Sequence, residues 1–130
     1  MASVVVSGDT SGSITLAAPT VSGSNTITLP ASTGNALVDV ARSLANPGYV
    51  RFSNGLIMQW GTISATGNTT TTVTYPLAFP TGTLSAQITI EQAGVTDFFA
   101  VKIESKSATQ LVIRSTDALT FTANWFALGN

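Results

Sequence analysis

Six carboxylates are the side chains best suited to chemistry in this 130-residue sequence, because it contains neither histidine nor cysteine. Two carboxylates at the right separation can cleave a glycosidic bond, and Asp97 and Asp117 both fall at predicted turns. Turns favour aspartate for backbone reasons, however, and no spacing here supports a catalytic pair. Glu104 stands between Lys102 and Lys106, which predicts a solvated surface. We therefore expect no enzyme activity, no cofactor and no metal site.

Aromatic side chains beside polar residues suggest sugar binding as a non-catalytic alternative. Phe98 and Phe99 are adjacent in a predicted strand, so their side chains point to opposite faces. If Phe99 points inward, Phe98 faces outward beside a predicted turn. The candidate binding residues are therefore Thr96, Asp97 and Phe98. A subunit interface explains an exposed Phe98 equally well.

Three further aromatics lie in strand-like segments. Trp60 and Trp125 fall inside alternating patterns and are predicted to pack in the core. Phe126 is next to Trp125 and must face the other way, so it is ambiguous between a binding site and an interface, like Phe98.

The composition excludes several classes of function. Without histidine and cysteine there is no Ser-His-Asp triad, no thiol nucleophile and no His- or Cys-ligated metal. Charged residues make up 8% of the chain, against a usual ~25%. The net charge of −1 offers no basic field for nucleic acid, and no apolar run approaches the ~20 residues that cross a bilayer. The sparse charge predicts instead that partner chains cover part of the surface.

The chain divides into three predicted segments, of which the first is residues 1–34. This Ser/Thr/Gly-rich segment contains two short alternating strands, Ser13–Leu16 and Thr26–Leu29. Each strand offers few apolar side chains, so we expect a β-rich stalk or oligomerisation segment that is ordered only by docking.

Residues 35–47 are predicted to form a short helix and a linker. Apolar residues recur with helical spacing at Leu37, Val40, Ala41 and Leu44. Asn46-Pro47-Gly48 is a helix stop. The apolar stripe packs either on sister helices at a symmetry axis or on the C-terminal domain, and the sequence does not separate these alternatives.

Residues 48–130 alternate between apolar and polar residues in about seven short strands, with turns every 8–12 residues. This pattern is typical of an antiparallel β-sandwich. Asn54-Gly55 is a hairpin signal. Inward-facing residues are predicted at Leu84, Ala86, Ile88, Ile90, Leu111, Ile113, Phe121, Ala123 and Trp125.

Several of these stretches resemble the C-terminal tip domain of bacteriophage tail fibres and R-type pyocin fibres. Residues 46–61, NPGYVRFSNGLIMQWG, are similar to the opening of that domain, with its Gly-Tyr, its Asn-Gly turn and its Gln-Trp-Gly block. Residues 75–80 and 125–129 resemble its later Ala-Phe-Pro element and its aromatic C-terminal strand. Residues 6–16 and 25–30 also look like segments of phage tail proteins. The resemblance therefore covers most of the chain.

The resemblance implies a virion-exposed fibre tip, synthesised in the host cytoplasm, with one β-sandwich per chain in an intertwined homotrimer. Its implied partners are a bacterial surface glycan or outer-membrane protein and other phage tail proteins. The family carries no catalytic residues to transfer, and Gln-Trp-Gly looks structural in it. The alternative function is a structural virion component, such as a fibre adaptor or decoration module, without a receptor of its own.

Overall fold

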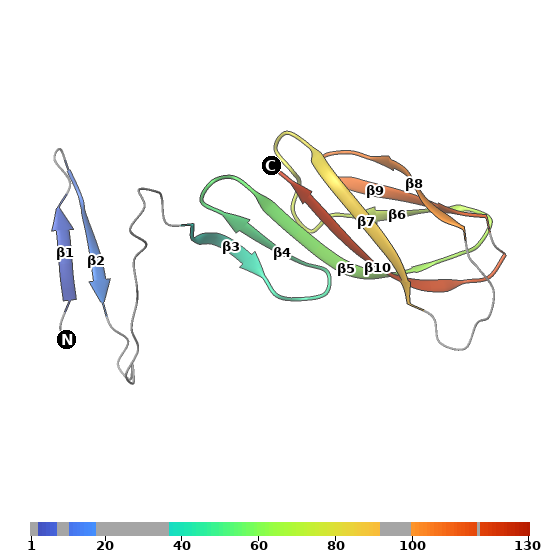
Figure 1. The fold of residues 1–130 in the computed structure, drawn as a ribbon, viewed down its shortest axis with the longest axis horizontal. Helices are drawn as coiled ribbons and strands as arrows, with labels where there is room; N and C mark the ends of the chain where they lie inside the picture. The colour runs from blue at the N-terminus through green and yellow to red at the C-terminus, as the bar shows by residue number, and fades with distance from the viewer. Residues whose placement is uncertain (1–2, 8–10, 18–36, 92–99, 117) are drawn as a thin grey trace. The chain divides into compact units, whose positions relative to one another are not determined.

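The computed structural model describes residues 3–7, 11–17, 37–91, 100–116 and 118–130. The chain forms two compact units, Met1–Asn35 and Ala36–Asn130. Every regular element in the described residues is a β-strand (Figure 1). In this part of the chain there is no helix long and apolar enough to cross a membrane.

The first unit contains an antiparallel hairpin. β1 (Ser3–Ser7) pairs along its whole length with β2 (Ser13–Ala17). Gly12 precedes β2 with a φ of +83°, a backbone conformation that glycine adopts without steric cost. β2 confirms the strand predicted at Ser13–Leu16, whereas the strand predicted at Thr26–Leu29 lies outside the described residues.

The second unit contains two antiparallel sheets (Figure 1). The order of the five-stranded sheet is β3 (Asp39–Ser43), β4 (Gly48–Phe52), β5 (Ile57–Ala65), β10 (Phe121–Gly129) and β7 (Thr83–Glu91). The order of the three-stranded sheet is β6 (Thr70–Thr74), β9 (Gln110–Ser115) and β8 (Val101–Lys106). The predicted all-β fold and antiparallel sandwich are therefore confirmed.

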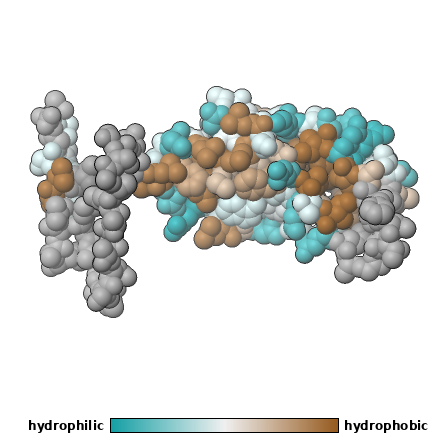
Figure 2. Space-filling model, viewed as in Figure 1, coloured by the Kyte–Doolittle hydropathy of each residue, from teal (hydrophilic) through white to brown (hydrophobic). Residues whose placement is uncertain are grey.

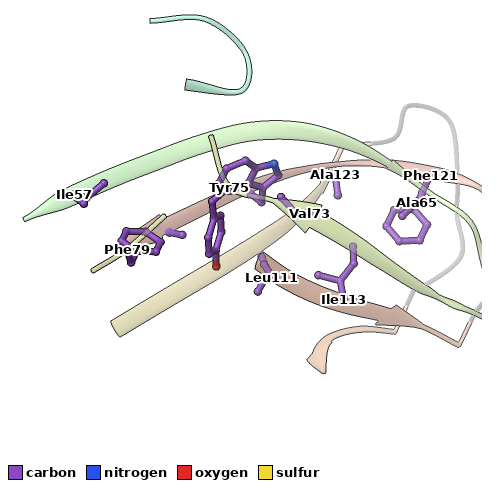
Figure 3. Close-up of a cluster of buried hydrophobic side chains, with 11 residues drawn as sticks. Ile57, Ala65, Val73, Tyr75, Phe79, Leu111, Ile113, Phe121 and Ala123 are labelled. Carbon is purple, nitrogen blue, oxygen red and sulfur yellow. The ribbon is translucent and has the colours of Figure 1, made fainter. Parts of the chain in front are cut away.

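An apolar core lies between the two sheets (Figure 3). Strand side chains alternate between the two faces of a sheet, and in β10 every second residue, beginning with Phe121, is buried. β9 contributes Leu111 and Ile113 from the other sheet. The inward positions predicted on these two strands are confirmed. The face of β10 that points away from the core is left for surface contacts.

β7 departs from its predicted alternation at one residue. Three of its predicted inward residues pack against the core, namely Ala86, Ile88 and Ile90. Leu84 is instead 63% exposed, so its inward prediction is wrong. Leu128 of β10 lies opposite Ser85. The next residue, Gly129, lies opposite Thr83, so Leu84 is an extra residue without a partner in β10, and such an irregularity interrupts the alternation.

The helix predicted within residues 35–47 is wrong for the described residues. The chain forms β3 there, at the edge of the five-stranded sheet. β-Branched Val38 and Val40 favour an extended backbone, and the Ser53 backbone N–H donates to the Val38 carbonyl at 2.9 Å. A helix of about ten residues is marginal by itself, whereas the edge of β4 offers a row of backbone hydrogen bonds.

Candidate functional site

The predicted binding residues Thr96, Asp97 and Phe98 lie outside the described residues, as does Asp117. Their role stays a prediction. Glu91, the last residue of β7, precedes them in the sequence and is exposed. Among the described residues, no cluster of three acidic side chains could hold a metal ion.

Glu104 lies on a solvated surface, as predicted. Its Oε2 is 2.8 Å from Nζ of Lys102 on the same strand, β8. The hydrogen bond from Lys102 lowers the pKa of Glu104. Exposed ion pairs of this kind contribute little to stability. The pair gives no reason to place chemistry on the three-stranded sheet.

Gln59 lies on the core side of the five-stranded sheet and is fully buried. Its side-chain Nε2 donates to the Leu77 carbonyl at 2.7 Å, and the Leu77 N–H donates to its Oε1 at 2.9 Å. These two bonds fix the segment between β6 and β7. In that segment the rings of Tyr75 and Phe79 meet edge to face, with centroids 5.0 Å apart (Figure 3).

Gly61 also has a structural role, because it makes room for Trp125. A Cβ atom on Gly61 would lie 2.8 Å from the Trp125 ring, closer than a side chain tolerates. Trp125 is buried and also contacts Tyr75, with ring centroids 5.7 Å apart. Its predicted core packing is therefore confirmed.

Trp60 lies on the other face of the same sheet. It is half-buried, between the inward-facing Gln59 and Gly61, so it must point away from the core. Its ring covers Gly48 of β4, where a Cβ atom would lie 2.8 Å from Cε2 of Trp60. Phe126, half-buried on β10, is its cross-strand neighbour. The prediction that Trp60 packs in the core is therefore wrong. The outer face of the five-stranded sheet carries two aromatic side chains, Trp60 and Phe126.

Polar side chains form a hydrogen-bonded row across this outer face. Asn46 Nδ2 donates to Thr62 Oγ1 at 3.1 Å, and the Thr62 N–H donates to Asn46 Oδ1 at 2.9 Å. Thr62 Oγ1 donates to Asn124 Oδ1 at 2.9 Å. Asn124 Nδ2 in turn donates to Glu91 Oε2 at 2.8 Å. We call these four residues the polar row.

A hollow of about 420 Å³ adjoins the polar row. Small-molecule sites in proteins typically occupy about 300–1,000 Å³. The hollow is bounded by the β3–β4 loop and by β5 and β10, and its lining residues are Leu44, Ala45, Asn46, Trp60, Gly61, Thr62, Asn124 and Trp125. Figure 2 shows apolar side chains gathered in patches on the visible face of the second unit, with hydrophilic side chains between them. The hollow combines both kinds of group and is the candidate binding site.

Comparison with protein families gives a match over most of the second unit. The family model described as "Putative tail fiber protein gp53-like, C-terminal" matches residues 51–130. The chain belongs to this tail fibre family. The match begins in β4 and includes the buried Gln59, the Trp60 ring and the Gly61–Trp125 contact. No curated protein sequence matches the chain.

Solved fibre structures share the fold of this gp53-like chain. The C-terminal part of the R2 pyocin fibre of P. aeruginosa is similar with a TM-score of 0.65 and 25% identity, over 75% of this chain and 26% of that one. An N-truncated R2-type pyocin tail fibre is similar with a TM-score of 0.65 and 25% identity, over 75% of this chain and 39% of that one. An N-truncated R1-type pyocin tail fibre gives a TM-score of 0.58 at 25% identity, over 75% of this chain and 88% of that one.

The gp53-like chain thus spans only about a quarter to two fifths of the two R2 fibre chains that it matches. Family membership places it among phage tail and pyocin fibre components. The matched region contains three members of the polar row, and Asn46 precedes it.

Sequence reasoning did not find the polar row. Its four residues come from one loop and three strands that are far apart in the chain. The alternation of β10 does place Asn124 on the face away from Trp125, but only the strand order puts Thr62 opposite it. The signal that was missing is therefore the pairing of β5 with β10.

Proposed function

We propose that this gp53-like chain is the receptor-binding tip of a phage tail fibre, which attaches the virion to a bacterial surface glycan or outer-membrane protein. The observation that supports this most is the family match over residues 51–130. Attachment in this proposal is non-catalytic. It uses side chains that hold a ligand, such as the polar row and Trp60, and it needs no reacting group.

We also propose that three copies of the chain assemble. Val40 in the edge strand β3 is more than half exposed, and so are Leu37 and Val38 just before this strand. An edge strand with apolar side chains is suited to contact with another chain. With three copies, a weak site gains affinity because the second and third contacts become intramolecular, typically by a factor of about 10²–10⁴.

The alternative, a structural tail component without a receptor, is favoured by a different observation. Val5 and Val6 of β1 are also more than half exposed, in a hairpin that has few groups of its own to bury them. Exposed apolar residues on a fibre segment suit contact with another tail protein.

Binding of the labelled chain to a panel of bacterial cells, compared with its binding to purified tail proteins, tests the two functions. We expect saturable binding to some of the cell types and no fall in the viscosity of their surface polysaccharide. Capture of tail proteins without binding to any cells would favour the structural alternative. A fall in viscosity would contradict the non-catalytic mechanism.

A further inference from the structure

We propose that the hollow beside the polar row binds a neutral sugar residue of a surface glycan through its hydroxyl groups. This inference rests on the proposed receptor-binding function, but it names the site and the chemical class of the ligand. The site is formed by described residues of the second unit.

The side-chain hydrogen bonds of the polar row all point one way, and the Thr62 backbone N–H returns one bond to the Asn46 oxygen. The amide of Asn46 donates to the Thr62 hydroxyl, that hydroxyl donates to Asn124, and the Asn124 amide donates to Glu91. Bonds in such a chain polarise one another, and the last one ends on a carboxylate, which strengthens it. The side chains are therefore held in place before a ligand arrives, which lowers the entropy cost of binding.

Each member of the row keeps further bonding capacity. A side-chain amide has two N–H donors and a carbonyl oxygen with two lone pairs, and a carboxylate has about four acceptor sites. The bonds of the row use one N–H and one oxygen lone pair of Asn46 and of Asn124, and one oxygen of Glu91. Donors and acceptors therefore both remain on these four exposed side chains. A sugar hydroxyl both donates and accepts, so it can bond to either kind of group.

The charges favour a neutral sugar over an acidic one. The described residues that line the hollow include no basic side chain. Glu91 places a negative charge at the end of the row, and an acidic sugar would meet that charge. Arg42, on the nearby strand β3, pairs with Asp39 at 3.0 Å. A carboxylated or phosphorylated sugar is therefore disfavoured at this site.

Apolar groups that also line the hollow suit the C–H face of a sugar ring. Leu44 is 74% exposed and lines the hollow together with Trp60. The Trp60 indole is held against Gly48, so its position does not depend on the ligand. A ring that places its hydroxyls on the polar row can rest its apolar face on these side chains.

NMR titration of the full chain with methyl glycosides of glucose, galactose and mannose tests the site. We expect at least one of them to shift the side-chain amides of Asn46 and Asn124 and the Trp60 indole N–H, with N-acetylneuraminic acid as an acidic probe that does not. Thr62→Val keeps the β-branched shape but removes the central hydroxyl, and it should weaken binding at least about tenfold. Thr72→Val, on an exposed position of β6, is the matched control and should bind as the wild type does.

Glu91→Gln separates charge from hydrogen bonding. It keeps an acceptor for Asn124, so binding of the neutral glycoside should change less than about threefold, while the acidic probe should now bind measurably better. If every glycoside shifts residues elsewhere, or if Thr62→Val binds as the control does, the site is wrong. A change of oligomeric state in Thr62→Val would instead assign the row to an interface between copies and would also overturn the proposal.

The two proposals fail in different ways. If the chain binds cells, Thr62→Val binds them equally well and no glycoside shifts the polar row, the sugar site is wrong and receptor binding stands. If a glycoside shifts the polar row but the chain binds no cells in the panel, the sugar site stands and the receptor-binding function is overturned.

Discussion

Gln59 shows how one polar residue can organise an apolar core. A buried amide costs free energy unless it is hydrogen-bonded. Here both of its polar atoms bond the backbone of Leu77. These bonds offset the cost of burying the amide, and they satisfy the Leu77 N–H and carbonyl at the same time. The same segment carries Tyr75 and Phe79 into the core.

Gln59→Leu is therefore expected to destabilise the fold, even though leucine is apolar and similar in size. The substitution leaves the Leu77 N–H and carbonyl without the partners that Gln59 supplies, at a cost of about 2–4 kcal/mol. Denaturant unfolding monitored by tryptophan fluorescence measures it. The control, Gln87→Leu on an exposed position of β7, should change stability by less than about 0.5 kcal/mol. Equal stability of the two variants would contradict the role assigned to Gln59.

At this scale the resemblance to fibre tip domains was more informative than the local residue pattern. The structural role expected of Gln59 and Gly61 from the resemblance agrees with their contacts. Trp60 was placed on the wrong face because a tryptophan in a strand pattern favours burial, whereas its room on the outer face comes from Gly48, on another strand. Such a contact is not visible without the pairing of β4 with β5.

Strands β3 and β7 show where local pattern and tertiary pairing disagree. Helical spacing at Leu37, Val40, Ala41 and Leu44 predicted a helix, but the edge of β4 stabilises an extended chain instead. The strands after residue 48 followed from alternation, because most of them have one buried and one exposed face. The irregularity at Leu84 depends on its pairing with β10 and could not be predicted from β7 itself.

The exposure of Leu84 at this irregularity can be tested by comparing two substitutions in β7. Leu84→Ala should leave the free energy of unfolding within about 0.5 kcal/mol of the wild type, because the side chain is already exposed. Ile88→Ala, on the same strand but packed against the core, should cost at least about 1 kcal/mol. Thermal or denaturant unfolding of the two variants compares them. A larger loss for Leu84→Ala would show that Leu84 is covered in the folded protein.

For the whole molecule, the sparse charge is the property to explain. Only 11 of 130 side chains are charged, 5 basic and 6 acidic, and described apolar residues at β3 remain exposed. Serine and threonine hydroxyl groups can keep a surface of this kind in contact with water, or other copies of the chain can cover it. The proposed assembly into a trimer would account for both the exposed valines and the low charge.

Val40→Lys tests that assembly. Val40 is exposed on β3, so the substitution should leave the fold intact and place a charge in the proposed subunit contact. We expect the mass measured by light scattering to fall from three times the 13.3 kDa of one chain to a single chain. Cell binding should weaken at least about a hundredfold with the loss of multivalency. Thr72→Lys on β6 is the control, and a wild type that is itself monomeric would contradict the proposal.

The position of β10 has a consequence for how the protein is made. This strand is the last to be synthesised of those described, yet it pairs with β5 on one side and β7 on the other. Until the ribosome has released it, those two strands lack their shared neighbour, and the buried face of β10 is missing from the core. The five-stranded sheet therefore closes only after translation has passed Gly129. A chain that terminates before β10 therefore lacks the strand that joins β5 to β7 and completes the core.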